Sequence, residues 1–98
     1  MMLPAIFHPE VQTEIDQTYA WYEEKRTGLG EEFLAKVREL LERIRENPEI
    51  HGLIHREVRA ALVRRFPYVV YYRAEQDRIV VLAIQHGRRN PRNWRSRM

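Results

Sequence analysis

The pattern of apolar residues changes halfway along this chain of 98 residues. In residues 10–46, apolar side chains recur every three or four positions, which is typical of amphipathic helices. In residues 57–86 they occur in short runs rich in β-branched and aromatic residues, which is typical of strands. Because a chain of this length has room for one core, helices followed by strands predict a single α+β domain over residues 1–98.

Two helices are predicted in the first half of the chain. Apolar residues spaced by four, four and three positions from Val11 to Tyr22 predict a helix of about 16 residues. Gly28–Gly30 interrupts this pattern, and a second helix with apolar positions from Phe33 to Ile44 ends at Asn47-Pro48. A link as short as this one indicates an antiparallel helical hairpin.

The other predicted elements are strands of one sheet. Residues 3–7 form a short apolar run that contains a proline, which is typical of an edge strand or a strand start. Residues 57–65, 68–74 and 78–86 predict a three-stranded antiparallel meander, and the basic tail that follows is predicted to be irregular. The predicted fold is therefore α+β, with the N-terminal strand, the hairpin and the meander in that order and the hairpin packed on one face of one sheet.

The hairpin is expected to cover only one face of this sheet. Two helices side by side are about 20 Å wide, which matches four strands spaced by about 4.8 Å and leaves nothing for the second face. Residues 68–74 and 78–86 are apolar on both faces of their strands. The second face is therefore predicted to be partly exposed, aromatic and bordered by arginines, as a partner-binding surface would be. In the alternative, the tail folds back over it.

Positive charge is concentrated in the second half of the chain. Residues 1–50 carry six basic and eleven acidic side chains, whereas residues 51–98 carry eleven arginines, no lysine and three acids. This asymmetry predicts an anionic partner for the second half. The planar guanidinium fork binds phosphate or carboxylate with two parallel hydrogen bonds. The alternative is that the arginines only keep strand edges solvated.

Composition also limits the kind of site and the compartment. The chain has no cysteine, so it has neither a disulfide framework nor a thiolate metal site. No apolar run approaches the roughly 18 residues of a membrane span, and the first ten residues lack the basic and apolar regions of a signal peptide. We expect a cytoplasmic protein with no metal, no cofactor and no membrane partner.

Three strings of the sequence are distinctive together: WYEEKRTGLGEEF (residues 21–33), VRRFPYVVYYR (residues 63–73) and HGRRNPRNW (residues 86–94). In their order they resemble the RelE/ParE superfamily of toxins, which includes plasmid stabilisation proteins, and the resemblance covers nearly the whole chain. The resemblance implies the toxin of a type II toxin–antitoxin module, held in a hetero-oligomer by a cognate antitoxin with an acidic C-terminal segment. ParE-like members bind and poison DNA gyrase, whereas RelE-like members cut messenger RNA at the ribosome.

The residues that RelE-like members use for cleavage are mostly absent. With Tyr68 and Gly87 to Arg89 as guides, the two lysines of that pattern fall on Ala60 and Leu62 and its first arginine falls on Val69. The second arginine matches Arg89, and the tail tyrosine falls on Arg95. The resemblance therefore favours a ParE-like toxin that acts by stoichiometric binding rather than by catalysis.

Two alternatives stay open at this point. A substitute nuclease site is conceivable, because a histidine with a pKa near 6.5 can act as acid or base and arginines stabilise a phosphorane. Its catalytic candidates are His86, Arg65 and Arg89. The chain could also be a diverged member that binds its antitoxin and poisons nothing.

Contact residues are predicted for both partners. Trp94, in the basic tail, is expected to be an aromatic contact at the target surface, since Trp and Arg dominate such surfaces. The candidates for target binding are Arg65, Arg73, His86, Arg88, Arg89, Arg92 and Trp94. The candidates for antitoxin binding are Trp21, Tyr71, Arg73 and Arg88.

Overall fold

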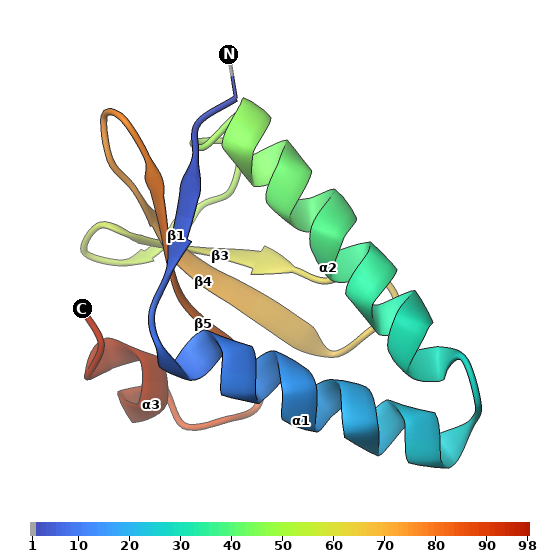
Figure 1. Ribbon diagram of the computed structural model, residues 1–98. Coiled ribbons are helices and arrows are strands. Elements are labelled where there is room, and N and C mark those ends of the chain that lie inside the picture. The colour runs from blue at the N-terminus through green and yellow to red at the C-terminus, as the bar shows by residue number, and fades with distance from the viewer. Residues whose placement is uncertain (1) are drawn as a thin grey trace.

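The computed structural model describes residues 2–98 and arranges them as one sheet with helices on both sides (Figure 1). The elements are, in order, β1 (Ala5–Phe7), α1 (Glu10–Lys25), α2 (Leu29–Glu46), β2 (Leu53–His55), β3 (Val58–Leu62), β4 (Tyr68–Ala74), β5 (Ile79–His86) and α3 (Arg92–Arg95). None of the described helices is long and apolar enough to cross a membrane.

The sheet has five strands in the order β1-β5-β4-β3-β2. β1 runs parallel to β5, with Ala5 opposite Ile79, and the other neighbours are antiparallel. The predicted N-terminal strand, helical hairpin and meander are confirmed, but the sheet is mixed rather than purely antiparallel. β2 was not predicted, because three residues next to His51-Gly52 are too short for a periodic signal.

The first strand of the meander is shorter than predicted. β3 ends at Leu62, and the chain turns through residues 63–67 before β4 begins. Arg65 lies in this turn with a left-handed backbone angle φ of 70°, so it is a turn residue and not a strand residue. Its side chain is exposed.

An irregularity in β5 changes which side chains share a face. Tyr71 pairs with Ala83 and Tyr72 pairs with Val81, so Leu82 is an extra residue opposite this step. Such a β-bulge reverses the alternation of side chains beyond it. Ile84 therefore packs in the cluster that contains Val81, on the hairpin side, although strict alternation would place these two residues on opposite faces.

The main core lies between the helical hairpin and the sheet. Phe33 and Ile44 of α2 are completely buried against Tyr72 and Val70 of β4. Phe33 also forms edge contacts with Phe66 and Tyr68, with ring centroids 5.4 Å away in each case. This aromatic packing fixes the end of the sheet at which β4 begins.

The second face of the sheet is covered by the tail, contrary to the prediction of an exposed face. Trp94 of α3 is 3 % exposed and packs with a second buried cluster. Figure 1 shows α3 and α2 on opposite sides of the sheet. The prediction was wrong because Pro91 begins a helical turn, which directs Trp94 inward. The residues buried with Trp94 are Val58, Tyr71, Val80, Leu82 and Ala83.

A carboxylate completes the turn between the two long helices. Glu23 accepts hydrogen bonds from the backbone N–H groups of Gly28 and Gly30 at 3.0 and 2.8 Å, which satisfies two donors at the start of α2. Gly28 has a left-handed φ of 91°. Gly30 is enclosed, because an added Cβ atom would lie 2.8 Å from the Tyr19 carbonyl oxygen.

Candidate functional site

The tail is held against the sheet by an aromatic stack. The rings of Trp94 and Tyr71 lie 4.9 Å apart and nearly parallel, with an angle of 16° between their planes. His55 of β2 meets Trp94 edge-on at 6.0 Å. Both Trp94 and Tyr71 are buried by this contact, so neither ring is free to contact a partner in this conformation. The expectation that Trp94 is an exposed aromatic contact is therefore wrong.

A buried ion pair makes a second attachment of the tail. The Arg97 guanidinium lies 2.8 Å from a Glu14 carboxylate oxygen and also donates to the Leu82 carbonyl oxygen at 3.0 Å. Glu14 further accepts hydrogen bonds from the backbone N–H of Ile84 at 3.0 Å and from the Gln85 side chain at 2.6 Å. These side chains occupy the part of the β5 edge that β1 is too short to cover. Sequence reasoning missed this ion pair, because no local pattern joins α1 to the last residues.

Two turns carry arginines to the same end of the sheet. The Gly87 N–H donates to the Pro67 carbonyl oxygen at 2.8 Å, which holds the turn after β5 against the turn after β3. Arg65 belongs to one turn and Arg88 and Arg89 belong to the other. The structure therefore brings together three of the predicted target-binding residues.

Further arginines surround α3. Arg92 and Arg95 are exposed on this helix, and Arg56 lies in the turn that follows β2. Burial lowers the pKa of His55 below its ordinary value of 6.5, and the positive charges of Arg95 and Arg56 lower it further. Both arginines are thus close to the histidine that contacts Trp94. Sequence reasoning did not single out Arg56 or Arg95 as partner contacts.

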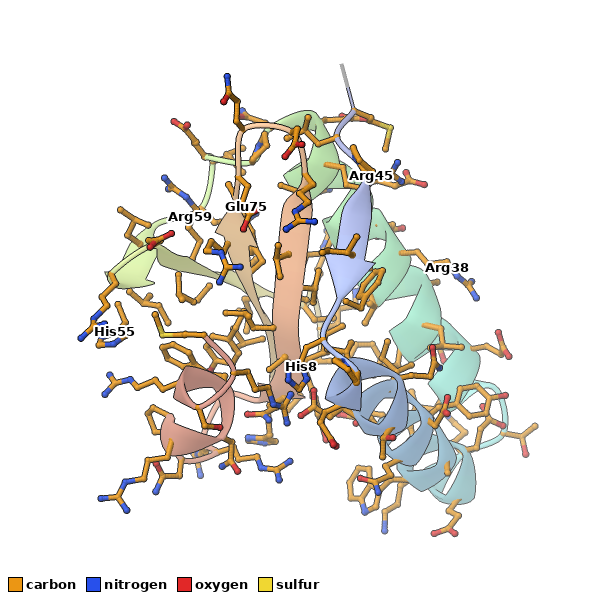
Figure 2. The ribbon with its side chains drawn as sticks, turned by 60° about the vertical axis from the view of Figure 1, so that its left-hand side comes forward. His8, Arg38, Arg45, His55, Arg59 and Glu75 are labelled. Atoms are coloured by element: carbon orange, nitrogen blue, oxygen red, sulfur yellow. The ribbon has the colours of Figure 1, made fainter. Side chains whose placement is uncertain are left out.

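We call this set of exposed arginines the cationic surface. Figure 2 shows α3 with nitrogen-tipped side chains fanning outward, near the labelled His55. Within residues 2–98, none of its six members forms a salt bridge. The members are Arg56, Arg65, Arg88, Arg89, Arg92 and Arg95.

Arg73 does not belong to the cationic surface, although it was predicted to bind both partners. It lies near the far end of β4 and forms an ion pair with Glu75 at 3.0 Å. Arg78 approaches the other oxygen of the same carboxylate at 2.7 Å. Hydrogen bonds from Arg78 and Arg73 lower the pKa of Glu75 below its ordinary value of 4.5. Arg73 is thus engaged within the chain.

His86 lies beside the cationic surface. Its ring centroid is 5.5 Å from that of Tyr68. A small hollow of about 220 Å³ is lined by His86, Arg89, Trp21 and Tyr68, among others. The backbone N–H of Arg88 donates to Nδ1 of His86 at 3.1 Å, so the neutral ring carries its proton on Nε2. Because this bond engages the Nδ1 lone pair, the neutral ring has no free lone pair for a general base, although its Nε2–H can still donate.

Three of the five positions that correspond to RelE-type catalytic groups are apolar here. Ala60 and Val69 pack against the buried cluster under Trp94. Leu62 is 68 % exposed and carries no group that moves a proton. Arg89 and Arg95 are exposed but have no acid or base beside them at hydrogen-bond distance within residues 2–98.

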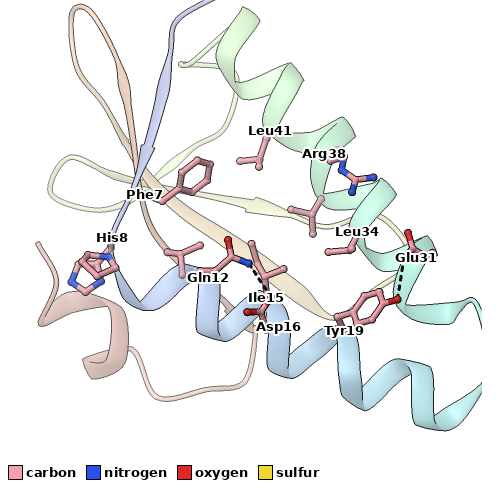
Figure 3. Close-up of a pocket in the computed structure, with 13 residues that line it drawn as sticks. Phe7, His8, Gln12, Ile15, Asp16, Tyr19, Glu31, Leu34, Arg38 and Leu41 are labelled. Carbon is pink, nitrogen blue, oxygen red and sulfur yellow. Dashed lines mark hydrogen bonds between the residues drawn. The ribbon is translucent and has the colours of Figure 1, made fainter.

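An apolar groove lies between the two helices of the hairpin. Figure 3 shows the groove, about 610 Å³, between α1, α2 and the end of β1. Its floor is apolar, with Ile15 and Leu34 on facing helices and Phe7 47 % exposed at one end. Polar pairs lie at its rim, including a hydrogen bond from the Tyr19 hydroxyl to Glu31 at 3.1 Å. Sequence reasoning did not predict this groove.

Trp21 is separate from this groove. It is 51 % exposed and lines the small hollow beside His86. The Lys25 ammonium lies 4.7 Å from the centre of its ring, so one aromatic face is already covered by a cation. Of the four predicted antitoxin contacts, only Trp21 and Arg88 are exposed.

The fold and its two surfaces define a small α+β domain suited to macromolecular partners. The family model described as ParE toxin of type II toxin-antitoxin system, parDE, matches residues 5–91. This chain therefore belongs to the ParE toxin family, and the predicted membership of the RelE/ParE superfamily on its ParE side is confirmed.

A solved structure has the same fold. It is a chain of the chromosomal ParDE TA system from P. aeruginosa, with a TM-score of 0.63 and 18 % sequence identity, and the match covers 87 % of this chain and 96 % of that one. No curated protein matches the sequence. The family match thus assigns the chain to the toxins of type II toxin–antitoxin systems, and the solved structure shows the shared fold.

Proposed function

We propose that this toxin acts in the cytoplasm by binding DNA gyrase stoichiometrically and is neutralised by a cognate antitoxin. The observation that carries the proposal is the contrast between six unpaired, exposed arginines and the missing lysines, arginine and tyrosine of RelE-type cleavage. Such a surface binds an anionic target without the groups that a phosphodiester cleavage requires. Arg65, Arg88, Arg89 and Arg92 are the residues we assign to the target.

The antitoxin is proposed to occupy the groove between α1 and α2. An apolar floor with polar pairs at the rim fits one face of an amphipathic segment. Phe7 would contact the apolar side of that segment, and Arg38 at the rim would meet its acidic residues. Acidic residues further along the antitoxin would reach the cationic surface and speed association. Neutralisation then follows from masking of the target-binding arginines.

An induction experiment tests the proposal. The chain is expressed from a tight promoter in a bacterium, with and without its neighbouring antitoxin gene, and growth, chromosome breaks and messenger RNA are followed in one culture. We expect early double-strand breaks and a DNA-damage response, both suppressed by the antitoxin. Unimpaired growth would indicate a diverged member that poisons nothing.

A nuclease is the second candidate, and one observation favours it. His86, Arg89 and Tyr68 surround the same hollow, which gives a donor, a cation and a hydroxyl at one place. In the induction experiment, this candidate predicts rapid loss of messenger RNA and translation with intact chromosomes. That result would contradict the gyrase proposal, and restoration of messenger RNA by His86→Asn would then identify the acid.

A further inference from the structure

We propose that the cationic surface binds the phosphodiester backbone of duplex DNA directly, so that the toxin contacts the DNA held by its target as well as the target protein. This inference rests on the proposed function, because gyrase is the enzyme that would hold this DNA. It adds a second ligand to the toxin and assigns that ligand to particular arginines.

The first support is the charge balance at the surface. Within residues 2–98, the carboxylates that form ion pairs all pair elsewhere: Glu32 with Arg26, Glu39 with Lys36, Glu75 with Arg73 and Arg78, and Glu14 with Arg97. None of the six arginines of the cationic surface has a carboxylate partner in the described part of the chain, although the Arg95 guanidinium lies 5.4 Å from the centre of the Trp94 ring. Exposed arginines without acidic partners leave a positive potential on this surface, which a polyanion neutralises.

The second support is the rigidity of the elements that carry the arginines. An isolated helix of four residues has no stability of its own, yet α3 is fixed by the Trp94–Tyr71 stack on one side and by Arg97 after its end. The turn that contains Arg88 and Arg89 is fixed by the hydrogen bond from Gly87 to Pro67. The positions of the cations are therefore set before binding, which reduces the entropy lost on binding.

The third support is the type of cationic side chain and the elements from which these side chains project. All members are arginines, whose planar fork matches a phosphate bidentately. They project from a helix and from turns, as Figure 2 shows for α3, whereas the apolar groove lies between the hairpin helices. Contacts of this kind with DNA phosphates position a protein on a duplex without reading the base sequence.

Salt dependence of binding gives the test. The full-length toxin is titrated into a fluorescent 20-base-pair duplex at several salt concentrations, and affinity is measured by anisotropy. If three to five arginines neutralise phosphates, affinity falls by about fortyfold to five-hundredfold between 50 and 200 mM salt. The double variant Arg92→Ala/Arg95→Ala should lower the slope of log affinity against log salt by about 2.

The matched control removes the same charge from the other side of the sheet. Arg38→Ala/Arg43→Ala takes two exposed arginines from α2 and should leave the slope nearly unchanged. Equal losses in the two double variants would overturn the proposal, because net charge alone would then explain binding. So would a failure to bind the duplex at 50 mM salt.

Two further ligands separate the alternatives. Poly-glutamate of similar charge that binds as tightly as the duplex would reassign the surface to acidic protein segments. Tighter binding of single-stranded RNA than of the duplex would overturn the assignment to DNA. Failure of the gyrase proposal is read separately, from the absence of chromosome breaks on induction, and it leaves a positive duplex titration standing.

Discussion

The Glu14 carboxylate and the Arg97 guanidinium lie 2.8 Å apart at the edge of β5 and join α1 to the end of the chain. Their side chains are 9 % and 12 % exposed, so the pair is nearly shielded from water. Glu14 also satisfies the Ile84 N–H, which lies beyond the reach of β1. The pair therefore covers the edge of β5 and fixes the C-terminal segment that contains α3.

Removal of Arg97 is expected to destabilise the fold. Arg97→Ala leaves the buried Glu14 carboxylate without its cation, and breaking a buried pair in this way costs about 3 kcal/mol. The loss is measured as the free energy of unfolding in urea. Arg92→Ala is the control, because it removes a nearby exposed arginine and should change stability by less than about 0.5 kcal/mol. Similar free energies of unfolding for the two variants would show that the ion pair contributes nothing to stability.

Trp94→Ala should also unfold the tail. The variant removes a ring that is stacked on Tyr71 and leaves the apolar face of the sheet uncovered, at a cost of about 3–5 kcal/mol. Near-ultraviolet circular dichroism and thermal unfolding measure the effect. Trp21→Ala, which removes a half-exposed tryptophan, should cost less than about 1 kcal/mol. If Trp94→Ala were as stable as the wild type, this would contradict the finding that α3 covers the second face of the sheet.

The helices were predictable because their apolar stripes are long and periodic. α1 and α2 were recognised from that period, and the meander was recognised from its runs of β-branched residues. The bulge at Leu82 was not, since it depends on how β5 pairs with β4 and not on local propensity. Strict alternation along β5 would therefore assign side chains to the wrong face beyond that residue.

The candidate site was predicted in part for a similar reason. Charge alone indicated that Arg88, Arg89 and Arg92 would be exposed, and they are. Trp94 was misplaced because an aromatic residue among arginines has the same local sequence whether it faces solvent or a sheet. The burial of Glu14 depends on Arg97, a partner at the far end of the chain, and no spacing rule connects the two.

Gly30 is expected to tolerate no side chain. A Cβ atom there would lie 2.8 Å from Glu23 Cγ and from the Tyr19 carbonyl oxygen, so α1 and α2 would have to separate. Alanine favours a helix by about 1 kcal/mol over glycine, but the overlap should outweigh this gain and destabilise the fold by about 1–3 kcal/mol. Gly52→Ala is the control, because nothing lies within 4 Å of its added Cβ. Thermal unfolding of both variants measures the effect. A Gly30→Ala variant more stable than the wild type would refute the close approach of α1 and α2 at Gly30.

The antitoxin proposal predicts an effect of Phe7→Ala. Truncation of a half-exposed ring at the end of the groove should weaken antitoxin binding by about thirtyfold, which corresponds to about 2 kcal/mol. Toxicity in the absence of antitoxin should persist. Leu62→Ala is the control, since it removes an apolar side chain that is exposed and lies outside the groove. Calorimetric titration with the antitoxin measures both, and equal affinities would place the antitoxin elsewhere.

Protonation of Glu75 should make the free energy of unfolding depend on pH in the acidic range. Hydrogen bonds from Arg78 and Arg73 lower its pKa in the folded chain below the ordinary value of 4.5. Its contribution is therefore fully present above about pH 4.5, where the unfolded chain is also ionised, and is lost as the pH falls through the lower folded pKa. The free energy of unfolding is measured by urea titration from pH 6 to pH 3, for the wild type and for Glu75→Gln. We expect the wild type to be the more stable at pH 6 and the difference to shrink steadily below pH 4.5. A difference that stays constant over this range would mean that the two arginines do not hold the carboxylate in its charged form.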